Sequence, residues 1–319
     1  MKAWLAVPNK AEARDTMEET QIGIEFILSL AGVAVLSIPG MVFLHSNRSG
    51  IRFRSAAPTE PPLWNGWLVL LALVGYQFFL GFFLAVFEGL QAADRILFDL
   101  PQEYDLPGPE NPNFVMYPSA ISIDAIRVTG AMLASGGVLA CWIWLRVAFK
   151  LRQPLATLGL CRAPVANLVP VILFSLFILA PIHLSGLGWR QCLEFLGHQS
   201  ALQALVLDFF KTVWGGDLVK IFLMVINAVV LAPVIEELIF RGFFFGLLRS
   251  RWGTLPALVF SSLVFAGYHF NLTVFLPLFF TSMAFGYIYS RTGSIYFSML
   301  SHAIFNGMNL LLPLFFFDM

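Results

Sequence analysis

The strongest constraint on the fold of this chain is a series of apolar stretches, each long enough to cross a lipid bilayer as a helix. Crossing the hydrocarbon core takes about 20 apolar residues in helical conformation. The apolar runs and the breaks between them predict helices near residues 22–45, 65–90, 122–148, 166–188, 217–247, 254–271, 273–290 and 295–316. The predicted fold is therefore all-α, a polytopic membrane helical bundle of about eight transmembrane helices.

Composition points to the same class of protein. Hydrophobic residues make up 58% of the chain and charged residues 12%, whereas soluble domains have about 45–50% apolar and about 25% charged residues. The formal net charge is zero, so charge gives no indication of a nucleic-acid partner. Cys141, Cys161 and Cys192 are far apart and lack the spacing of a metal site. The expected partner is the lipid bilayer, and we expect a multi-pass membrane protein.

The loops between the predicted helices differ in charge, and this difference predicts the orientation. One set of loops is basic and carries Arg48, Arg52, Arg54, Arg146, Lys150, Arg152, Arg162, Arg249, Arg251 and Arg291. The other set, which includes the long loop at about 91–121, is richer in acids. Because basic loops stay in the cytoplasm, the first set is predicted to be cytoplasmic and both termini to lie outside.

Polar residues divide the chain into two parts. Residues 1–205 are predicted to form an N-terminal membrane region of about four helices with non-cytoplasmic loops. Residues 206–319 contain three polar clusters within or beside apolar stretches: EELIFR at Glu236–Arg241, FAGYH at Phe265–His269 and HAIFN at His302–Asn306. An ionisable residue at the centre of a membrane helix costs about 2.5–3.5 kcal/mol on insertion scales. The clusters therefore predict a functional site between helices of the second part.

The spacing within the clusters separates structural from reactive candidates. Glu237 and Arg241 stand four residues apart, in the favourable order for an ion pair on one helix face. Glu236 points about 100° away from Glu237, and no basic residue lies one turn after it. An unpaired carboxylate at membrane depth is a candidate general base.

The third cluster supplies groups that complement this base. His302 and Asn306 are also four residues apart and share a helix face. With His269, the clusters offer a base, a partner imidazole and two hydrogen-bond donors. These are the groups that activate water and stabilise an oxyanion during amide hydrolysis.

The ordered set resembles the CAAX protease and bacteriocin-processing (CPBP, or Abi) family of intramembrane endopeptidases, which includes the Ras-converting CAAX endopeptidase. The family pattern EExxxR, FxxxH and HxxxN is matched in order, and the resemblance covers about residues 206–317. It implies that Glu236 and His269 hold and deprotonate the attacking water, while His302 and Asn306 form the oxyanion hole. Glu237 and Arg241 would brace the site. The implied substrate is a peptide or a lipidated protein, with prenylated CAAX-type proteins among the candidates.

Several alternatives stay open at this point. A Glu with two His can bind zinc in other folds, so a metal-dependent variant of the same peptidase is the nearer rival. Because HExxH is absent, no metal or other cofactor is predicted. A transporter or a scaffold with buried Glu and His is the rival from another class, although matched inverted halves are not evident. The oligomeric state has no signature in the sequence.

Overall fold

The computed structural model describes residues 62, 64–97, 118–198, 209, 212–213 and 217–311. All regular structure within these ranges is helical, which confirms the predicted all-α fold class. The predicted helix at 22–45 lies outside the described residues.

The helices before residue 200 form one group along the chain. They are α2 (Gly66–Leu97), α3 (Pro118–Ile143) with its π-helical continuation η2 (Trp144–Lys150), the short 3-10 turns η3 (Leu155–Leu158) and η4 (Val165–Asn167), and α4 (Leu168–Phe195). Pro154 and Pro164 precede the two 3-10 turns in extended conformation. These prolines suit such positions because the ring fixes φ and removes the backbone donor.

The second group contains one long rod, three further α-helices and a short 3-10 turn. The rod runs without a break through α6 (Leu218–Ile226), η5 (Asn227–Leu231), α7 (Ala232–Glu237), η6 (Leu238–Phe245) and α8 (Gly246–Trp252). After the rod come α9 (Thr254–Tyr268), the 3-10 turn η7 (Leu272–Val274), α10 (Phe275–Thr292) and α11 (Ile295–Leu311). Both η5 and η6 are π-helical, a geometry that is frequent at functional sites. They enclose the short segment α7, which carries Glu236 and Glu237.

Within the described residues, five helices are long and apolar enough to cross a membrane, so the protein is a multi-pass membrane protein. They are Gly66–Glu88, Ala125–Lys150, Val165–Phe195, Leu218–Trp252 and Leu272–Thr292. The predicted segments at 254–271 and 295–316 do form helices, α9 and α11, but within the described residues these have 15 and 17 residues. The predicted count of about eight spans is therefore confirmed only for these five.

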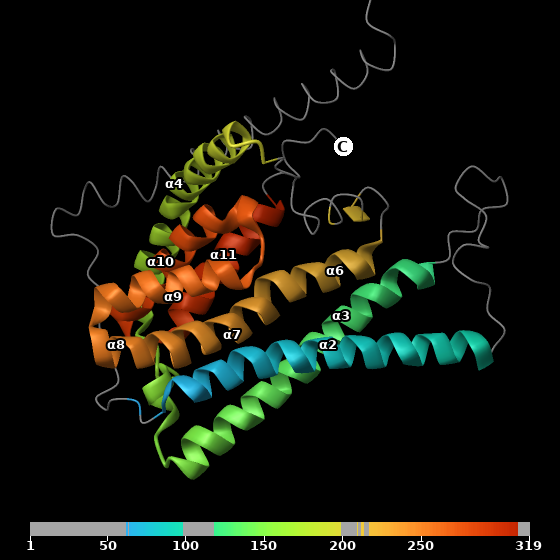
Figure 1. Cartoon of the computed structure of the whole chain (residues 1–319), viewed down its shortest axis with the longest axis horizontal. Helices are drawn as coiled ribbons and strands as arrows, with labels where there is room; N and C mark the ends of the chain where they lie inside the picture. Colours follow the sequence, from blue (N-terminus) through green and yellow to red (C-terminus); the bar gives the residue numbers. More distant parts are fainter. Residues whose placement is uncertain are drawn as a thin grey trace, which may run out of the picture.

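The rod lies in the middle of the molecule (Figure 1). On one side it contacts α2 and α3, which cross each other, and on the other side it contacts α9, α10 and α11, with α4 packed outside α10 and α11. The indole Nε1 of Trp64 donates a hydrogen bond of 3.0 Å to the carbonyl of Phe243. This buried bond joins the segment before α2 to the rod.

A tight contact fixes the turn between α10 and α11. Gly159, which follows η3, has a φ of 80°, and a Cβ placed there would lie 2.4 Å from the ring of Tyr289. The carbonyl of Gly159 accepts a 3.0 Å hydrogen bond from the backbone N–H of Ile295. The loop between η2 and α4 therefore holds the start of α11, the helix that carries the third polar cluster.

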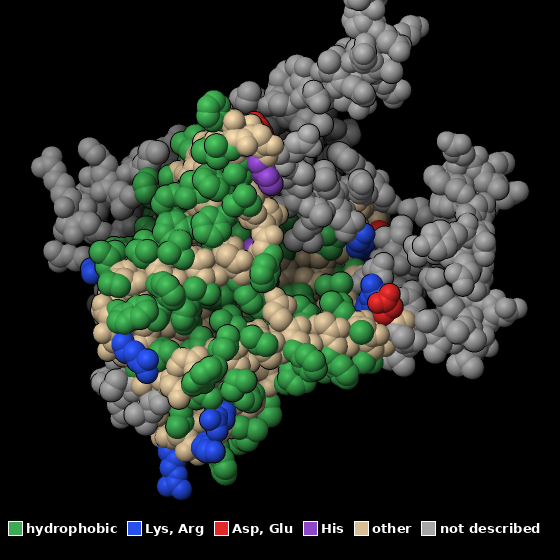
Figure 2. Space-filling view, in the orientation of Figure 1, with side chains coloured by type: hydrophobic (Ala, Val, Ile, Leu, Met, Phe, Trp, Pro, Cys, Tyr) green, Lys and Arg blue, Asp and Glu red, His purple; other side chains and the backbone are tan. Residues whose placement is uncertain are grey.

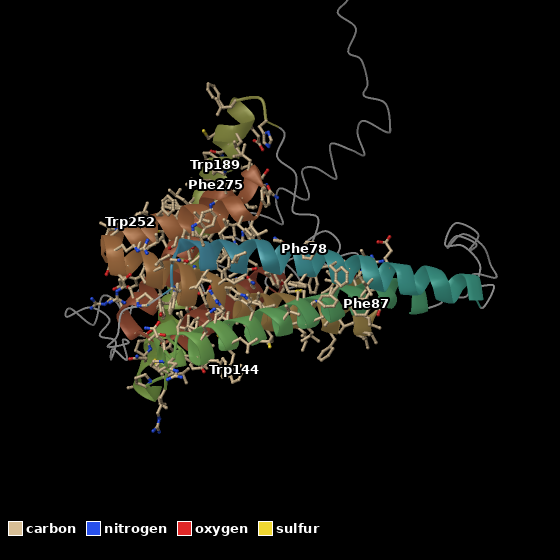
Figure 3. All side chains as sticks on the ribbon, turned by 60° about the horizontal axis from the view of Figure 1, so that its bottom comes forward. Phe78, Phe87, Trp144, Trp189, Trp252 and Phe275 are labelled. Atoms are coloured by element: carbon tan, nitrogen blue, oxygen red, sulfur yellow. The ribbon has the colours of Figure 1, made fainter. Side chains whose placement is uncertain are left out.

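The visible surface is mostly apolar, as expected for a protein surrounded by lipid (Figure 2). Phe78 on α2 is 65% exposed and Trp144 is 52% exposed, and both side chains lie at the periphery of the bundle (Figure 3). Lys and Arg side chains gather at the end where α8 lies (Figure 2). The helix ends there include Lys150, Arg249 and Arg251.

Candidate active site

The three polar clusters come together where the rod meets α9, α10 and α11. The rod supplies Glu236, Glu237 and Arg241, near the middle of the Leu218–Trp252 helix. The continuous helix extends well beyond these residues on both sides. His269 ends α9, and His302 lies on α11.

Glu237 is the centre of a buried polar network. Its side chain is fully buried, and its Oε1 lies 3.0 Å from Arg241 Nη1 and 3.0 Å from His302 Nδ1. The hydroxyl of Ser298 donates to the other carboxylate oxygen, Oε2. The predicted ion pair between Glu237 and Arg241 is thus present. A buried ion pair is tolerated when its remaining polar atoms find partners, and His302 and Ser298 provide them.

Arg241 is fixed on its other side by α10. Its Nη2 donates to the carbonyl of Ser282 at 3.0 Å and to the hydroxyl of the same residue at 2.9 Å. The guanidinium carbon also lies 5.0 Å and 5.5 Å from the ring centres of Phe265 and Phe285, within cation–π range. Arg241 therefore links the rod to α9 and α10 through a single side chain.

The ring of His302 has one defined orientation. Its Nδ1 faces the Glu237 carboxylate, so this nitrogen carries the proton and donates. Its Nε2 lies 3.9 Å from Glu236 Oε2. The ring stacks on Phe285 with a centroid separation of 4.7 Å. Glu237 thus turns the second nitrogen of His302 toward Glu236.

Glu236 is the carboxylate that the network leaves available. Its side chain is 23% exposed, and it lines a cavity of about 350 Å³ together with His269. Among the described groups, its buried Oε2 has no hydrogen-bond partner. Glu236 lacks a partner on its own helix, as the spacing predicted, and its contact with His302 comes from another helix.

His269 reaches the same cavity from the end of α9. Its Nδ1 donates to the carbonyl of Phe265 at 2.8 Å, and its ring packs against the Phe265 ring with a centroid separation of 4.8 Å. This hydrogen bond selects the tautomer in which Nε2 has the lone pair. The predicted face shared by Phe265 and His269 is therefore observed, and His269 has a nitrogen that can accept a proton.

Asn306 lies one turn after His302 on α11. Its Nδ2 donates to the carbonyl of Ala228, in the π-helical turn η5, at 2.8 Å. An amide nitrogen has two hydrogens, so this bond uses half of its donor capacity. The contact holds α11 against the rod, and Asn306 is not among the residues that line the cavity.

Sequence reasoning missed several residues around the site. Ser298 lies four residues before His302 and shares its helix face, a spacing that could have revealed it. Tyr76 and Gln77, from α2, line the cavity with Glu236 and are adjacent polar residues in an apolar span. Ser282 has no signal in the sequence, because its contact with Arg241 depends on how α10 packs.

The arrangement of His, Cys, Asp and Glu side chains bears on metal binding. Within the part of the chain that the structure describes, no three His, Cys, Asp or Glu side chains are grouped to hold a metal ion. The prediction that the protein uses no metal remains a prediction.

Fold and site together define a class: a multi-pass membrane protein with a buried carboxylate and imidazole cluster beside a cavity. Residues 218–308, which include all six predicted site residues, match the type II CAAX prenyl endopeptidase Rce1-like family. This segment is a domain of that family, part of the CPBP or Abi group, and the family is one of peptidases.

Part of the chain is also similar to a curated protein. The chain is 37% identical over 78 residues to the UPF0177 protein YaiF of Lactococcus lactis subsp. lactis (strain IL1403). The match covers 24% of this chain and 34% of the relative, so the chain spans about a third of that protein. No solved structure gives a significant match.

Proposed function

We propose that this protein is an intramembrane endopeptidase that cleaves peptide bonds of membrane-associated proteins or peptides, with prenylated CAAX-type proteins as the first candidates. One observation carries the proposal. Glu236, whose Oε2 is without a described hydrogen-bond partner, lies beside His302 and lines a cavity with His269. This carboxylate belongs to a domain of a peptidase family.

In the proposed mechanism, Glu236 and His269 hold the attacking water, and one of them takes its proton. The hydroxide then attacks the carbonyl carbon, and the proton passes to the leaving amine as the peptide bond breaks. The lone pair that the Phe265 hydrogen bond leaves on His269 Nε2 supports this assignment. A positioned base of this kind contributes about 10²–10⁴-fold to the rate.

His302 and Asn306 are proposed to stabilise the oxyanion of the tetrahedral intermediate. In that role His302 donates from Nε2 as well as from Nδ1 and is therefore an imidazolium. The carboxylate of Glu237, 3.0 Å from Nδ1, supplies the counter-charge. Asn306 contributes the amide hydrogen that Ala228 does not use. Glu237 and Arg241 act as positioning residues.

We propose that the whole chain has about eight spans, with its basic loops in the cytoplasm of a bacterium and with the cavity reached from that side. The gathering of Lys150, Arg249 and Arg251 at one end of the bundle supports this orientation. The division into an N-terminal region, 1–205, and a protease core, 206–319, is part of the same proposal.

The test uses purified full-length protein and an internally quenched peptide with a farnesylated cysteine followed by two aliphatic residues and a variable terminal residue. Glu236→Gln should lower turnover at least 100-fold, since it removes the base but keeps the shape. Glu88→Gln, which alters an exposed carboxylate on α2, is the matched control. Equal turnover by wild type and Glu236→Gln would contradict the mechanism.

Two further measurements address the alternatives. Loss of activity on chelation, with recovery on adding zinc, would replace the metal-free mechanism by a metal-dependent one. Proton flux into liposomes that requires Glu236, without any peptide cleavage, would favour a transporter. An unprenylated copy of the peptide shows whether the lipid is required.

A further inference from the structure

Tyr76 lies between two cavities, one at the candidate active site and one between α2 and α3. One is the cavity of about 350 Å³ that Glu236 and His269 line. The other is a cavity of about 210 Å³ between α2 and α3. Tyr76 is the residue that lines both. The two cavities therefore meet at Tyr76.

The second cavity, called here the side pocket, is apolar. Large apolar side chains of α2 and α3 surround it, and small residues create its volume; the lining is Leu71, Ala72, Gly75, Tyr76, Phe79, Ser135, Val138, Leu139 and Trp142. A Cβ added at Gly75 would meet nothing within 4 Å. An apolar lining of this kind suits an apolar side chain.

The side chain of Tyr76 is packed between α2 and α3. The side chain starts on α2 and is buried among the apolar residues that pack α2 and α3 against the rod, including Leu139 and Phe240. The ring is therefore held by packing between α2, α3 and the rod.

We propose that Tyr76 is a specificity-determining residue: its ring closes the side pocket off from the catalytic cavity and limits the size of the apolar substrate side chain beside the scissile bond. The proposal rests on the proposed peptidase function. The side pocket is the extension that a larger side chain would occupy, because it meets the catalytic cavity at Tyr76 and has an apolar lining.

The first test measures the barrier without using activity. Val138 lies in the side pocket. After Cys141, Cys161 and Cys192 are replaced by Ala, the substitution Val138→Cys places a single cysteine there. A charged, water-soluble methanethiosulfonate reagent should modify this cysteine about tenfold faster when Tyr76→Ala is added. Tyr76→Phe keeps the ring and should leave the rate nearly unchanged.

Leu80→Ala is the matched control for this experiment. Leu80 lies one turn after Tyr76 on α2 and lines the catalytic cavity without lining the side pocket. Its truncation should not change labelling in the pocket, whereas equal acceleration by Leu80→Ala would show general loosening and overturn the proposal. If Tyr76→Ala fails to fold, Tyr76→Leu replaces it. A folded Tyr76 variant whose labelling rate is no faster than that of the unaltered Tyr76 protein also overturns the proposal.

The second test measures selectivity with the farnesylated peptide series, in which the residue after the cysteine is Ala, Leu, Phe or Trp. Tyr76→Ala should raise the ratio of kcat/KM for Trp to that for Ala about tenfold, and Tyr76→Trp should lower it. An unchanged ratio with accelerated labelling refutes the selectivity role. If wild type cleaves none of the peptides, the proposed function fails on these substrates, while the labelling still decides whether Tyr76 is a barrier.

Discussion

His302 Nδ1 lies 3.0 Å from Glu237 Oε1, and this contact joins α11 to the rod inside a buried cluster of charges. The Oε1 atom of Glu237 therefore has two partners, because Arg241 contacts the same oxygen at 3.0 Å. The sequence predicted a brace made of Glu237 and Arg241 alone. In the structure, the brace also sets the orientation of a ring that faces Glu236.

Glu237→Gln should destabilise the protein strongly, whereas Glu236→Gln should not. The first change removes the charge that balances buried Arg241 and leaves a cation in an apolar surrounding. Loss of one member of a buried pair costs about 3–5 kcal/mol. Thermal unfolding in detergent micelles, monitored by circular dichroism, compares the two variants. Equal midpoints for the two variants would show that the buried pair contributes little to stability.

Ser298→Ala should weaken the same cluster to a smaller extent. The change removes a hydroxyl that donates to Glu237 and leaves the carboxylate with fewer hydrogen bonds. An unsatisfied buried acceptor costs about 1–3 kcal/mol, more when it is charged. The peptidase rate should fall with the melting temperature, because Glu237 orients His302.

Ser290→Ala is the control for that variant. Its hydroxyl also forms a hydrogen bond of 2.8 Å, but to the carbonyl of Tyr287 on its own exposed helix face. The melting temperature of this variant should stay within about 1 °C of wild type, given that surface substitutions change stability by less than about 0.5 kcal/mol. A similar fall in melting temperature in both serine variants would contradict the role assigned to Ser298.

Local spacing explains which parts of the site were predictable. Glu237 with Arg241, and Phe265 with His269, meet across one helical turn, so the sequence alone places them together. The meeting of Glu236 with His302 was predicted only through the resemblance to a family. Ser282 and Tyr76 reach the site through packing of α10 and α2, and no local pattern records such contacts.

The fold shows the same division between local and tertiary information. Apolar length predicted the helices well, because each long apolar stretch has to satisfy its backbone internally. The π-helical turns around α7 were not predicted, since a search for apolar periodicity assumes 3.6 residues per turn. The α9 helix is shorter than its apolar stretch because its end, Tyr268, passes into the turn that positions His269.

Cys161 should react slowly with thiol reagents at neutral pH. Burial raises the pKa of the Cys161 thiol above its ordinary value, so less of the reactive thiolate is present at a given pH. Cys192 is exposed near the end of α4 and serves as the internal control. Mass spectrometry after brief N-ethylmaleimide treatment should find Cys192 modified first at pH 7. The difference in rate between the two cysteines should narrow as the pH rises; modification of Cys161 as fast as Cys192 at pH 7 would contradict the assignment.

Gly159→Ala should cost more stability than Gly197→Ala, although both glycines have a φ of 80°. Each substitution places a Cβ in the left-handed region, which costs roughly 1–2 kcal/mol. At Gly197 the new methyl meets nothing within 4 Å, whereas at Gly159 it would lie 2.4 Å from the Tyr289 ring. The clash should add about 1–3 kcal/mol and disturb the start of α11. Melting temperatures of the two variants, measured together with peptide turnover, separate backbone strain from steric clash. Only Gly159→Ala should also lose activity, since Gly159 holds the turn from which α11 carries His302 into the site.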